Sequence, residues 1–387
     1  MPAKKKIALF TNYLSFGGTE RVISLLCNEL IKYHDVTLII IADKIEFQLY
    51  KDVKVIVLTK ENFDKKKSIL SKILLFSKAL KSYNKALKQN NIQIAISFLV
   101  LPNLINSFAK IFNKNLKTVI SERCFPSIIY SFRKFSMLLF KFIVKYFYNK
   151  NDLMFSNSIY INQDLIDNFG LKIGTKVVYN PIELPNQNIH FADYSHNTDS
   201  FKVITVGRLA KQKNHHITIE SFKSLTPNFY LEIFGIGPLE NQLKTLTNQL
   251  NLEKRVHFKG SVTNIKDYLA KGDCLVLSSI TEGFPNVILE AMSVGLPVIS
   301  SNCMSGPLEL LNENEPVKIE IGSYFKAKYG ILVNVNDIQG LSKAIQFLQT
   351  NDDVKQYYSE KGLERVKDYE VSKIGLEMNK LVNLVNK

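Results

Sequence analysis

Residues 273–301 read DCLVLSSITEGFPNVILEAMSVGLPVISS and decide the fold of this chain. An apolar run ends at Ser278–Ser279, a turn carries Glu282-Gly283-Phe284-Pro285, an apolar helix is expected from about Asn286, and LPVISS forms a second apolar run. Short buried strands that are joined through a helix are typical of a parallel sheet covered by helices on both faces. The stretch therefore predicts a strand–turn–helix–strand unit of a doubly wound α/β domain.

The same alternation occurs twice along the 387 residues. The first half holds the strand candidates KIALFTNY, DVTLIIIA, AISFLV and TVISE, and the second half holds FKVITVGRL, FYLEIFG, VHFKG and DCLVLSS. We therefore expect two Rossmann-like doubly wound domains, residues 1–181 and 201–370, which face each other across a cleft. The polar segment 182–200, with Pro181 and Pro185 at its start, is the predicted linker.

The formal net charge of +15 lies entirely in the first half of the chain. Residues 1–190 hold 28 Lys and Arg against 13 Asp and Glu, whereas residues 191–387 hold 22 of each. This asymmetry predicts a polyanionic partner for the first half, and nucleic acid, an anionic membrane surface and a phosphorylated substrate are all compatible with it.

Cysteine spacing and hydropathy exclude several classes of protein. The four cysteines share no Cys-x-x-Cys or Cys/His spacing, which argues against a disulfide scaffold and a structural zinc site. The start MPAKKKIALF lacks the apolar run of a signal peptide, and no continuous apolar stretch of about 18 residues occurs. We expect a cytoplasmic protein that is neither secreted nor membrane-spanning.

Two basic segments interrupt the regular pattern of the first half. Residues 63–88 combine helically spaced apolar residues, Ile69, Ile73, Leu74, Phe76 and Leu80, with eight lysines and one acid. Residues 127–150 hold five basic residues, eight aromatics and no acid. Either both segments are surface helices whose apolar stripe packs on the sheet, or they adhere to anionic lipid. The candidate acceptor or membrane residues among them are Lys66, Lys67, Lys72, Lys78, Arg133, Lys134 and Lys141.

The turn after DCLVLSS is the first candidate site. Gly283 permits close approach of a ligand to the backbone, Glu282 offers a carboxylate to sugar hydroxyls, and Glu290 offers one to the paired hydroxyls of a ribose. The alternative is that Glu282 caps the helix and Glu290 is a solvated helix residue.

Two glycine-containing loops add to this site. Gly207, Arg208 and Lys213 follow the strand KVITV, and the guanidinium and ammonium groups suit a diphosphate, unless both are ordinary surface charges. Gly237 in FGIGPLE either brings the backbone to a nucleotide base or builds a turn. Gly17 and Gly18, after the first strand, either approach a ligand or form a tight turn.

These motifs, in this order, resemble those of the retaining family 4 glycosyltransferases of the GT-B fold. Besides Gly17–Glu20 and Glu282–Met292, the similarity includes Tyr179-Asn180-Pro181, Val206–Lys213 and Ser305–Glu309. The resemblance implies a nucleotide-sugar donor held mainly by the second domain, an acceptor held mainly by the first, and transfer with retention of configuration. It also implies that a final helix, residues 371–387, packs back on the first domain.

Carried over to this sequence, the resemblance assigns Arg208 and Lys213 to the donor diphosphate and Glu290 to the ribose hydroxyls. It assigns Glu282 to the transferred sugar. The backbone amides of Gly283, Phe284, Pro285 and Asn286 would surround that sugar, although the amide of Pro285 has no N–H to donate. Gly17 and Gly18 would line the opposite side of the cleft. The departing phosphate would help to deprotonate the acceptor, which leaves little for a protein base to do. Arg208 and Lys213 would neutralise the leaving diphosphate in place of a metal, and no Asp-x-Asp motif occurs, so no metal and no cofactor are expected.

One position departs from the family pattern. Many members carry a His in the first domain near the reacting sugar, but here TVISE runs into Arg123, and His34 is the only His before residue 190. Either Arg123 or Glu122 occupies that place, or the two form a structural salt bridge. A guanidinium cannot act as a base at neutral pH, so an Arg there would act electrostatically.

The favoured function is transfer of a hexose or N-acetylhexosamine, from a donor that family frequency predicts to be UDP-linked, to a lipid-carrier-linked glycan. The enzyme would work as a peripheral protein on the inner face of the membrane, in bacterial surface polysaccharide or glycoconjugate synthesis. The alternatives are the same chemistry on a soluble acceptor and a nonenzymatic polyanion-binding protein, although no nucleic-acid motif is recognisable.

Overall fold

The computed structural model describes residues 4–15, 17–59, 68–131, 134–185 and 200–385 and divides into two compact units. Unit 1 comprises Met1–Pro181 and Val371–Lys387, and unit 2 comprises Ile182–Glu370. Most of the predicted linker, residues 186–199, lies outside the described residues.

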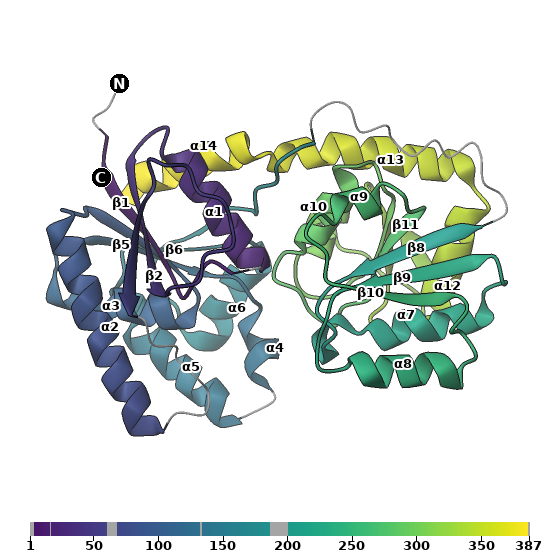
Figure 1. Ribbon diagram of the computed structural model, residues 1–387, viewed down its shortest axis with the longest axis horizontal. Helices are drawn as coiled ribbons and strands as arrows, with labels where there is room; N and C mark the ends of the chain where they lie inside the picture. Colours follow the sequence, from purple (N-terminus) through teal and green to yellow (C-terminus); the bar gives the residue numbers. More distant parts are fainter. Residues whose placement is uncertain (1–3, 16, 60–67, 132–133, 186–199, 386–387) are drawn as a thin grey trace. The chain divides into compact units, whose positions relative to one another are not determined.

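Unit 1 is built on a parallel sheet with strand order β3-β2-β1-β4-β5-β6-β7 (Figure 1). Its strands are β1 (Lys6–Thr11), β2 (Asp35–Ala42), β3 (Lys54–Thr59), β4 (Ile94–Phe98), β5 (Lys117–Glu122), β6 (Leu153–Ser156) and β7 (Thr175–Val177). Its helices are α1 (Gly18–Leu30), α2 (Ile69–Gln89), α3 (Val100–Phe112), α4 (Pro126–Ser131), α5 (Lys134–Tyr146), η1 (Tyr148–Lys150), α6 (Ile159–Phe169) and α14 (Val371–Val385).

Successive side chains along the strands of unit 1 point alternately into two hydrophobic cores, one on each face of the sheet. Ile7 and Leu9 of β1 pack with α1 and α14, whereas Ala8 and Phe10 pack on the other face with α2 and α3. Every one of these four strand residues is fully buried, as expected for a parallel sheet covered on both sides. Around Ile120 of β5, the second face continues under α5 and α6.

The final helix α14 belongs to unit 1 although it follows unit 2 in sequence. Met378 is fully buried in the core that α1 shares with β1, and two polar contacts fix the helix. The His34 ring nitrogen Nε2 lies 2.8 Å from Asn379 Oδ1, and Lys5 Nζ donates to Asn383 Oδ1 at 2.7 Å. The chain therefore closes the first core with its last helix.

Unit 2 repeats the architecture with strand order β10-β9-β8-β11-β12-β14-β13, in which only β13 is antiparallel. Its strands are β8 (Phe201–Val206), β9 (Phe229–Phe234), β10 (Val256–Gly260), β11 (Cys274–Leu277), β12 (Val298–Ser301), β13 (Tyr324–Lys326) and β14 (Ile331–Val333). Its helices are η2 (Lys211–Lys213), α7 (His215–Ser221), η3 (Phe222–Ser224), α8 (Glu240–Gln249), α9 (Lys266–Leu269), α10 (Asn286–Met292), α11 (Pro307–Asn312), α12 (Ile338–Gln349), α13 (Asp352–Val366) and η4 (Lys367–Tyr369). The prediction of two Rossmann-like domains is confirmed.

The apolar stripe expected in residues 63–88 does not pack on the sheet along its whole length. The face of α2 that packs inward is Leu75, Ala79, Tyr83, Ala86 and Leu87, whereas Ile73 and Leu74 are 56% and 57% exposed. A 21-residue helix is about 32 Å long, but a five-residue strand such as β4 spans only about 17 Å. The first turns of α2 therefore extend beyond the strand that follows it. Among the described residues, no helix is both long enough and apolar enough to span a bilayer.

The close approach of α14 to α1 generates the first prediction. A Cβ atom on Gly375 would lie 2.1 Å from Cγ of Glu29, a buried side chain that also pairs with Lys32 at 2.6 Å. Gly375→Leu should lower the free energy of unfolding by about 1–3 kcal/mol, because α14 must move away from α1. Urea-induced unfolding measures this change. The control Leu376→Ala, at a side chain that is 45% exposed, should change it by less than about 0.5 kcal/mol, and equal effects would contradict the packing argument.

Candidate active site

The residues that the sequence predicts for donor binding in unit 2 follow three neighbouring strands. Gly207, Arg208 and Lys213 follow β8, Gly237 follows β9, and Glu282–Pro285 follow β11. Strand β8 pairs with both β9 and β11, and the strand order reverses between β8 and β11. In open α/β sheets, ligands bind outside the carboxyl ends of the strands at this switch point. The structure therefore brings these residues to the edge where a ligand is expected.

An ion pair joins the loops after β8 and β11. Lys213 Nζ lies 2.7 Å from Glu282 Oε1, and Ser279 Oγ donates to the same oxygen at 2.5 Å. The Glu282 side chain is 7% exposed and that of Lys213 is 22% exposed, so the pair is largely shielded from water. The other oxygen, Oε2, accepts no hydrogen bond from any residue that the structure describes. The carboxylate is thus fixed through one oxygen, and the binding of a ligand hydroxyl by the second stays a prediction.

The backbone on either side of Glu282 is held by a loop that sequence analysis noted only as part of the resemblance. Glu282 N donates to Met304 O at 2.8 Å, and Ser305 N donates to Glu282 O at 2.9 Å. Ser305 Oγ also donates to Gly283 O at 2.8 Å. A Cβ on Gly306 would lie 2.6 Å from Cδ of Pro285, so only glycine lets this loop approach the turn. Ser279 and Ser305 position the glutamate, and neither role could be read from spacing.

Glycines bring the loops after β8 and β9 into backbone contact. A Cβ on Gly237 would lie 2.4 Å from Leu209 O, and one on Gly235 would lie 2.0 Å from Gly207 O. The aliphatic part of Lys213 lies against Gly207, with Cδ 3.2 Å from the position of a Cβ there. These contacts favour the interpretation of FGIGPLE as a turn that packs on its neighbour. A role of Gly237 toward a nucleotide base stays a prediction.

Arg208 and Glu290 differ in exposure. The Arg208 side chain is exposed, and its guanidinium makes no hydrogen bond or ion pair with the residues that the structure describes. Glu290 lies on α10, which begins at Asn286, and is 9% exposed. The mobile cation is therefore Arg208, while Lys213 is already held by a carboxylate.

The Phe284 side chain points into unit 2 and anchors the turn of residues 282–285, which we call the donor turn after its predicted role. It is 6% exposed, and its ring centroid lies 5.6 Å from that of Tyr369 in η4. Arg365 of α13 stacks on Tyr369 at 5.2 Å and on Tyr329 at 5.0 Å. Any contact of Phe284 with a donor would therefore use its backbone, as the resemblance implies.

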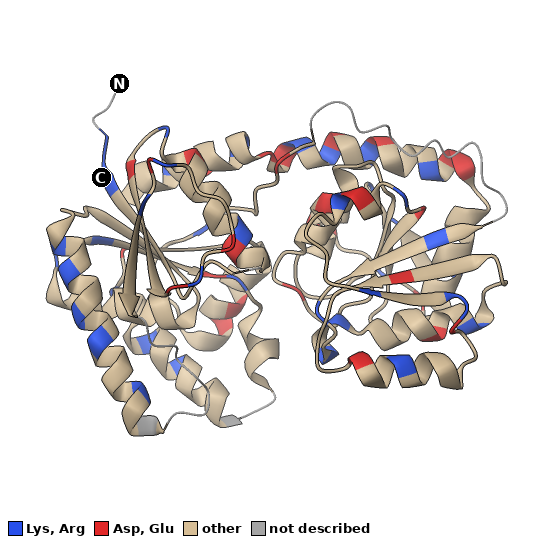
Figure 2. Ribbon diagram, viewed as in Figure 1, with Lys and Arg blue, Asp and Glu red and all other residues tan. Residues whose placement is uncertain are grey.

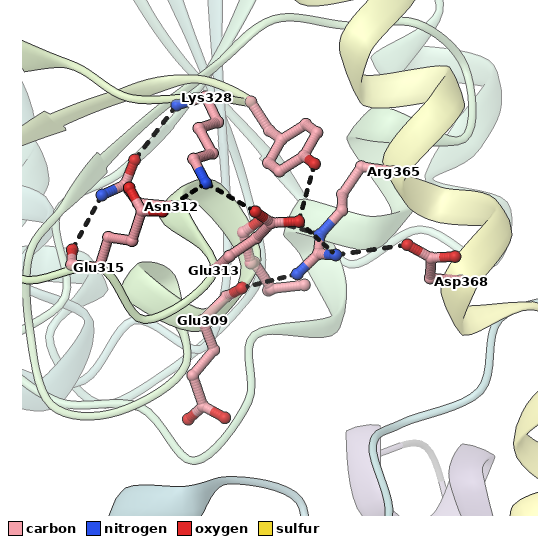
Figure 3. A network of polar contacts seen from close by, with 9 residues as sticks. Glu309, Asn312, Glu313, Glu315, Lys328, Arg365 and Asp368 are labelled. Atoms are coloured by element: carbon pink, nitrogen blue, oxygen red, sulfur yellow. Dashed lines mark hydrogen bonds and ion pairs between the residues drawn. The ribbon is translucent and has the colours of Figure 1, made fainter.

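The same Arg365 holds the end of α11 (Figure 3). Its Nη2 donates to Glu309 O at 2.9 Å, and its Nη1 lies 3.3 Å from Asp368 Oδ2. Lys328 Nζ joins Glu313 and Glu315 at 2.8 and 2.6 Å in the same network. Because α11 begins beside Gly306 and the donor turn, this cluster fixes the far end of the segment that supports the turn.

In unit 1, Gly17 and Gly18 form the start of α1. Gly17 has extended backbone, and no side chain caps the helix through it. A Cβ on Gly17 would lie 2.3 Å from Oε2 of Glu20, so the glutamate folds back over this helix end. Burial raises the pKa of Glu20. An anion at this position would have to displace the Glu20 carboxylate, and the assignment of Gly17 and Gly18 to the donor stays a prediction.

Glu122 and Arg123 do not form the salt bridge that was one alternative, because each has other partners. Glu122 Oε1 accepts from Tyr148 Oη at 2.5 Å and from Asn103 Nδ2 at 3.1 Å. Arg123 Nη2 donates to Asn180 Oδ1, within the Tyr-Asn-Pro motif. Arg123 is 4% exposed, and burial lowers its pKa to about 10. Asn103 and Tyr148 could not be predicted as partners of Glu122, because they are 19 and 26 positions away in the sequence.

Those of the predicted acceptor or membrane lysines that the structure describes lie on two helices of unit 1. Lys72 and Lys78 are exposed on α2, and Lys141 is exposed on α5. Lys134 is the first residue of α5, and its side chain lies outside the described part of the chain, as do Lys66, Lys67 and Arg133. Within the described ranges, no three His, Cys, Asp or Glu side chains are grouped so that they could hold a metal ion.

The Lys213–Glu282 pair generates a stability prediction. Lys213→Met leaves a buried carboxylate without its cation and should lower the free energy of unfolding by about 2 kcal/mol in urea titrations. The double variant Lys213→Met/Glu282→Gln should lose less than the sum of the single changes, because neutral Gln does not need the cation. Lys244→Met is the control, since the Lys244–Glu240 pair has the same 2.7 Å distance but side chains 49% and 35% exposed. Its expected cost is below about 1 kcal/mol, and an equal cost at both sites would contradict the burial argument.

Glu122 generates a pH prediction. Burial raises its pKa from 4.5 to about 7, so the fold favours the protonated form, and this contribution to stability is lost as pH rises from about 4.5 to 7. Buried His215, whose pKa is lowered from 6.5 to about 4, has the opposite sign and loses its contribution as pH falls through that range. Glu122→Gln should therefore gain stability relative to the wild type as pH rises from 4.5 to 7, in parallel urea titrations. The His215 contribution cancels in this difference, and a pH-independent difference would exclude the expected titration of Glu122.

Comparisons with known proteins agree with this architecture. Residues 16–185 match the family described as Glycosyltransferase Family 4, and residues 186–365 match Glycosyl transferases group 1. The chain is 30% identical over 372 residues, 96% of its length and 97% of the relative's, to N-acetylgalactosamine-N,N'-diacetylbacillosaminyl-diphospho-undecaprenol 4-alpha-N-acetylgalactosaminyltransferase of Campylobacter jejuni. A second C. jejuni relative, GalNAc-alpha-(1->4)-GalNAc-alpha-(1->3)-diNAcBac-PP-undecaprenol alpha-1,4-N-acetyl-D-galactosaminyltransferase, is 28% identical over 388 residues, 97% of this chain and 98% of the relative.

Solved structures show the same fold. HepE of Anabaena, crystallised in complex with UDP and glucose, has a TM-score of 0.76 at 19% identity, with 98% of this chain and 99% of that chain covered. The two matched regions together extend over nearly the whole sequence, and the first contains β2 to β7 of the unit 1 sheet while the second contains β8 to β14 of the unit 2 sheet. The chain therefore belongs to glycosyltransferase family 4 and has the GT-B fold.

Proposed function

We propose that this glycosyltransferase is a retaining enzyme that moves a hexose or N-acetylhexosamine from a UDP-linked donor to a glycan on a lipid carrier. The observation that carries the proposal is the fixed Lys213–Glu282 pair, 2.7 Å apart, at the switch point of the unit 2 sheet. The two C. jejuni relatives support the acceptor class, because their names state that they act on undecaprenol-linked saccharides. The HepE complex supports UDP as the nucleotide.

The donor diphosphate would be held by cations and not by a resident metal. Arg208 presents a planar guanidinium to phosphate oxygens, and Lys213 keeps two ammonium protons beyond the one directed at Glu282. Both charges would then lie beside the negative charge that develops as the diphosphate departs, and fixed charges of this kind stabilise a leaving group without reorganisation. This chemistry agrees with the expectation that no metal is required.

The two glutamates would grip hydroxyl groups on either side of the diphosphate. Oε2 of Glu282 accepts a hydroxyl of the transferred sugar, while Lys213 and Ser279 hold Oε1. Glu290, on the helix after the donor turn, accepts the ribose hydroxyls. A carboxylate fixed through one oxygen loses little conformational freedom when the other binds, which favours a defined orientation of the sugar.

The transfer step would need no protein base. The bond from the sugar C1 to the phosphate oxygen breaks, and a bond from C1 to the acceptor oxygen forms on the same face. The acceptor proton passes to the departing phosphate oxygen, so charge and atoms balance. Arg123 cannot take this proton at neutral pH, and Oε1 of the buried Glu122 already accepts hydrogen bonds from Tyr148 and Asn103. Unit 1 would supply the acceptor contacts, with the enzyme peripheral on the inner membrane face.

Arg208 provides the test of this function. Purified protein is incubated with UDP-glucose, UDP-galactose, UDP-GlcNAc, UDP-GalNAc and GDP-mannose, and release of nucleotide diphosphate is measured. Arg208→Ala should reduce the rate with the preferred donor by about 10²–10³-fold, because a cation is lost from the leaving group. Glu290→Ala should raise the KM for the donor, and both variants should retain the wild-type circular dichroism spectrum.

Two controls separate the parts of the proposal. Lys271→Ala, at an exposed lysine of the same unit, should leave the rate unchanged.

Activity that persists in EDTA agrees with a metal-independent reaction, and activity that EDTA abolishes and Mg²⁺ restores would contradict it. If none of the sugars turns over and Arg208→Ala binds UDP like the wild type, the proposed donor site is wrong. The anomeric configuration of a transferred sugar, measured by NMR, decides retention.

A further inference from the structure

Helix α5 has two apolar faces, of which only one is buried. Phe140 and Val144 point into unit 1 and are 2% and 0% exposed. The opposite face carries large apolar side chains at spacings of three and four residues, which form one stripe along the helix. They are Phe135 at 77% exposure, Leu138 at 66%, Leu139 at 49%, Phe142 at 50% and Tyr146 at 49%. A surface helix of a globular protein normally directs polar residues outward, so this stripe requires a partner.

The first turns of α2 extend the apolar area. Leu70, Ile73 and Leu74 are 68%, 56% and 57% exposed, because this part of α2 extends beyond the length of β4. A chain of aromatic rings links α2 to α5. Phe76 packs on Phe108 of α3 at 5.5 Å, Phe108 on Phe147 at 4.8 Å, and Phe147 on Phe142 at 6.0 Å. We call the eight exposed side chains on the two helices the α2/α5 apolar surface.

Charge on the two helices has a single sign (Figure 2). Neither Ile69–Gln89 nor Lys134–Tyr146 contains an Asp or Glu. The exposed lysines of α2 and α5 are Lys72, Lys78, Lys81, Lys85, Lys88, Lys141 and Lys145. Lys145 Nζ lies 5.4 Å from the centre of the Tyr146 ring, so an ammonium group borders the apolar stripe directly. Apolar side chains bordered by lysines without acids match the headgroup boundary of an anionic bilayer.

We propose that the α2/α5 apolar surface inserts into the headgroup region of an anionic membrane. Lysines alone would predict attraction that salt abolishes, whereas the exposed Phe135, Leu138 and Phe142 predict a contribution that salt does not remove. A second copy of this chain is the less favourable occupant. A symmetric pair would place the same surface on itself and bring lysine-only surfaces together without a single acid between them. The inference deepens the proposed function, on which it rests for the peripheral location, by naming the surface that would enter the lipid.

The chain has no tryptophan, which permits a direct test. Leu138→Trp places one fluorophore in the stripe, and Ile321→Trp places one on unit 2, at a side chain that is 95% exposed. Each variant is mixed with vesicles of phosphatidylcholine and phosphatidylglycerol, with and without brominated acyl chains. Insertion should shift the emission of Leu138→Trp to shorter wavelength and quench it with bromine, while Ile321→Trp stays unchanged. Unshifted and unquenched emission from Leu138→Trp would overturn the proposal.

A loss-of-binding variant gives an independent readout. Phe135→Ser/Leu138→Ser/Phe142→Ser changes only side chains that are at least half exposed, so the core of unit 1 stays intact. In vesicle flotation it should bind at least tenfold more weakly than the wild type at low and high salt, whereas Lys141→Gln/Lys145→Gln should weaken binding mainly at low salt. Equal flotation of the triple variant and the wild type would refute insertion.

Two further measurements separate the alternatives. The mass of the lipid-free protein is measured by analytical ultracentrifugation. A dimer mass, together with a blue shift of Leu138→Trp emission that grows with protein concentration, would identify a second copy as the partner and overturn the membrane proposal. The triple variant should keep the wild-type rate of donor hydrolysis in solution. Loss of vesicle binding with hydrolysis retained supports insertion, and absence of hydrolysis in the wild type itself would count against the proposed function alone.

Discussion

The ion pair between Lys213 and Glu282 is the constraint on which the candidate site depends. It joins residues 69 positions apart, across the point where the unit 2 sheet reverses its strand order. Removing an ammonium and a carboxylate from water costs free energy, and this cost is recovered only when the geometry is good and further hydrogen bonds exist. Ser279 supplies one such bond, and Gly207 leaves room for the lysine stem. The pair therefore acts chiefly by fixing the positions of a cation and a carboxylate at this edge of the sheet.

Holding the pair requires that the donor turn does not move. The loop of Met304 to Gly306 is bonded to Glu282 and Gly283 on one side, and the Phe284 ring packs on Tyr369 on another. Tyr369 O also accepts from Ile182 N, at the two points where the chain enters and leaves unit 2. The turn that would carry the sugar is thus packed against the residues that border unit 1 in sequence. A change in the backbone at Tyr369 would reach the turn through the contact between the Tyr369 and Phe284 rings.

The sequence predicted the fold well because strand burial and helix periodicity are local properties. It also placed Arg208, Lys213 and Glu282 at strand ends, since the carboxyl edge of a parallel sheet follows from strand order. It assigned Lys213 and Glu282 to different ligand groups and gave no sign that they bind each other, because partners of side chains depend on tertiary approach. For a related reason, the sequence left open whether the apolar residues of α2 are buried on the sheet or exposed. Spacing shows which residues share a face, but only the length of the neighbouring strands shows how much of that face is covered.

The partner of the α2/α5 apolar surface is identified by its lysines and its exposed apolar side chains taken together, and not by either feature alone. Lysines on α2 that served only solubility would be expected beside a polar surface and interspersed with acids. Instead, the acid-free helices α2 and α5 are also the ones with Leu70, Leu138 and Phe135 turned outward, each more than 60% exposed. A polyanion such as nucleic acid would use the lysines and leave these side chains in water. A lipid surface satisfies both features, and it is also where the acceptor of the proposed reaction would be found.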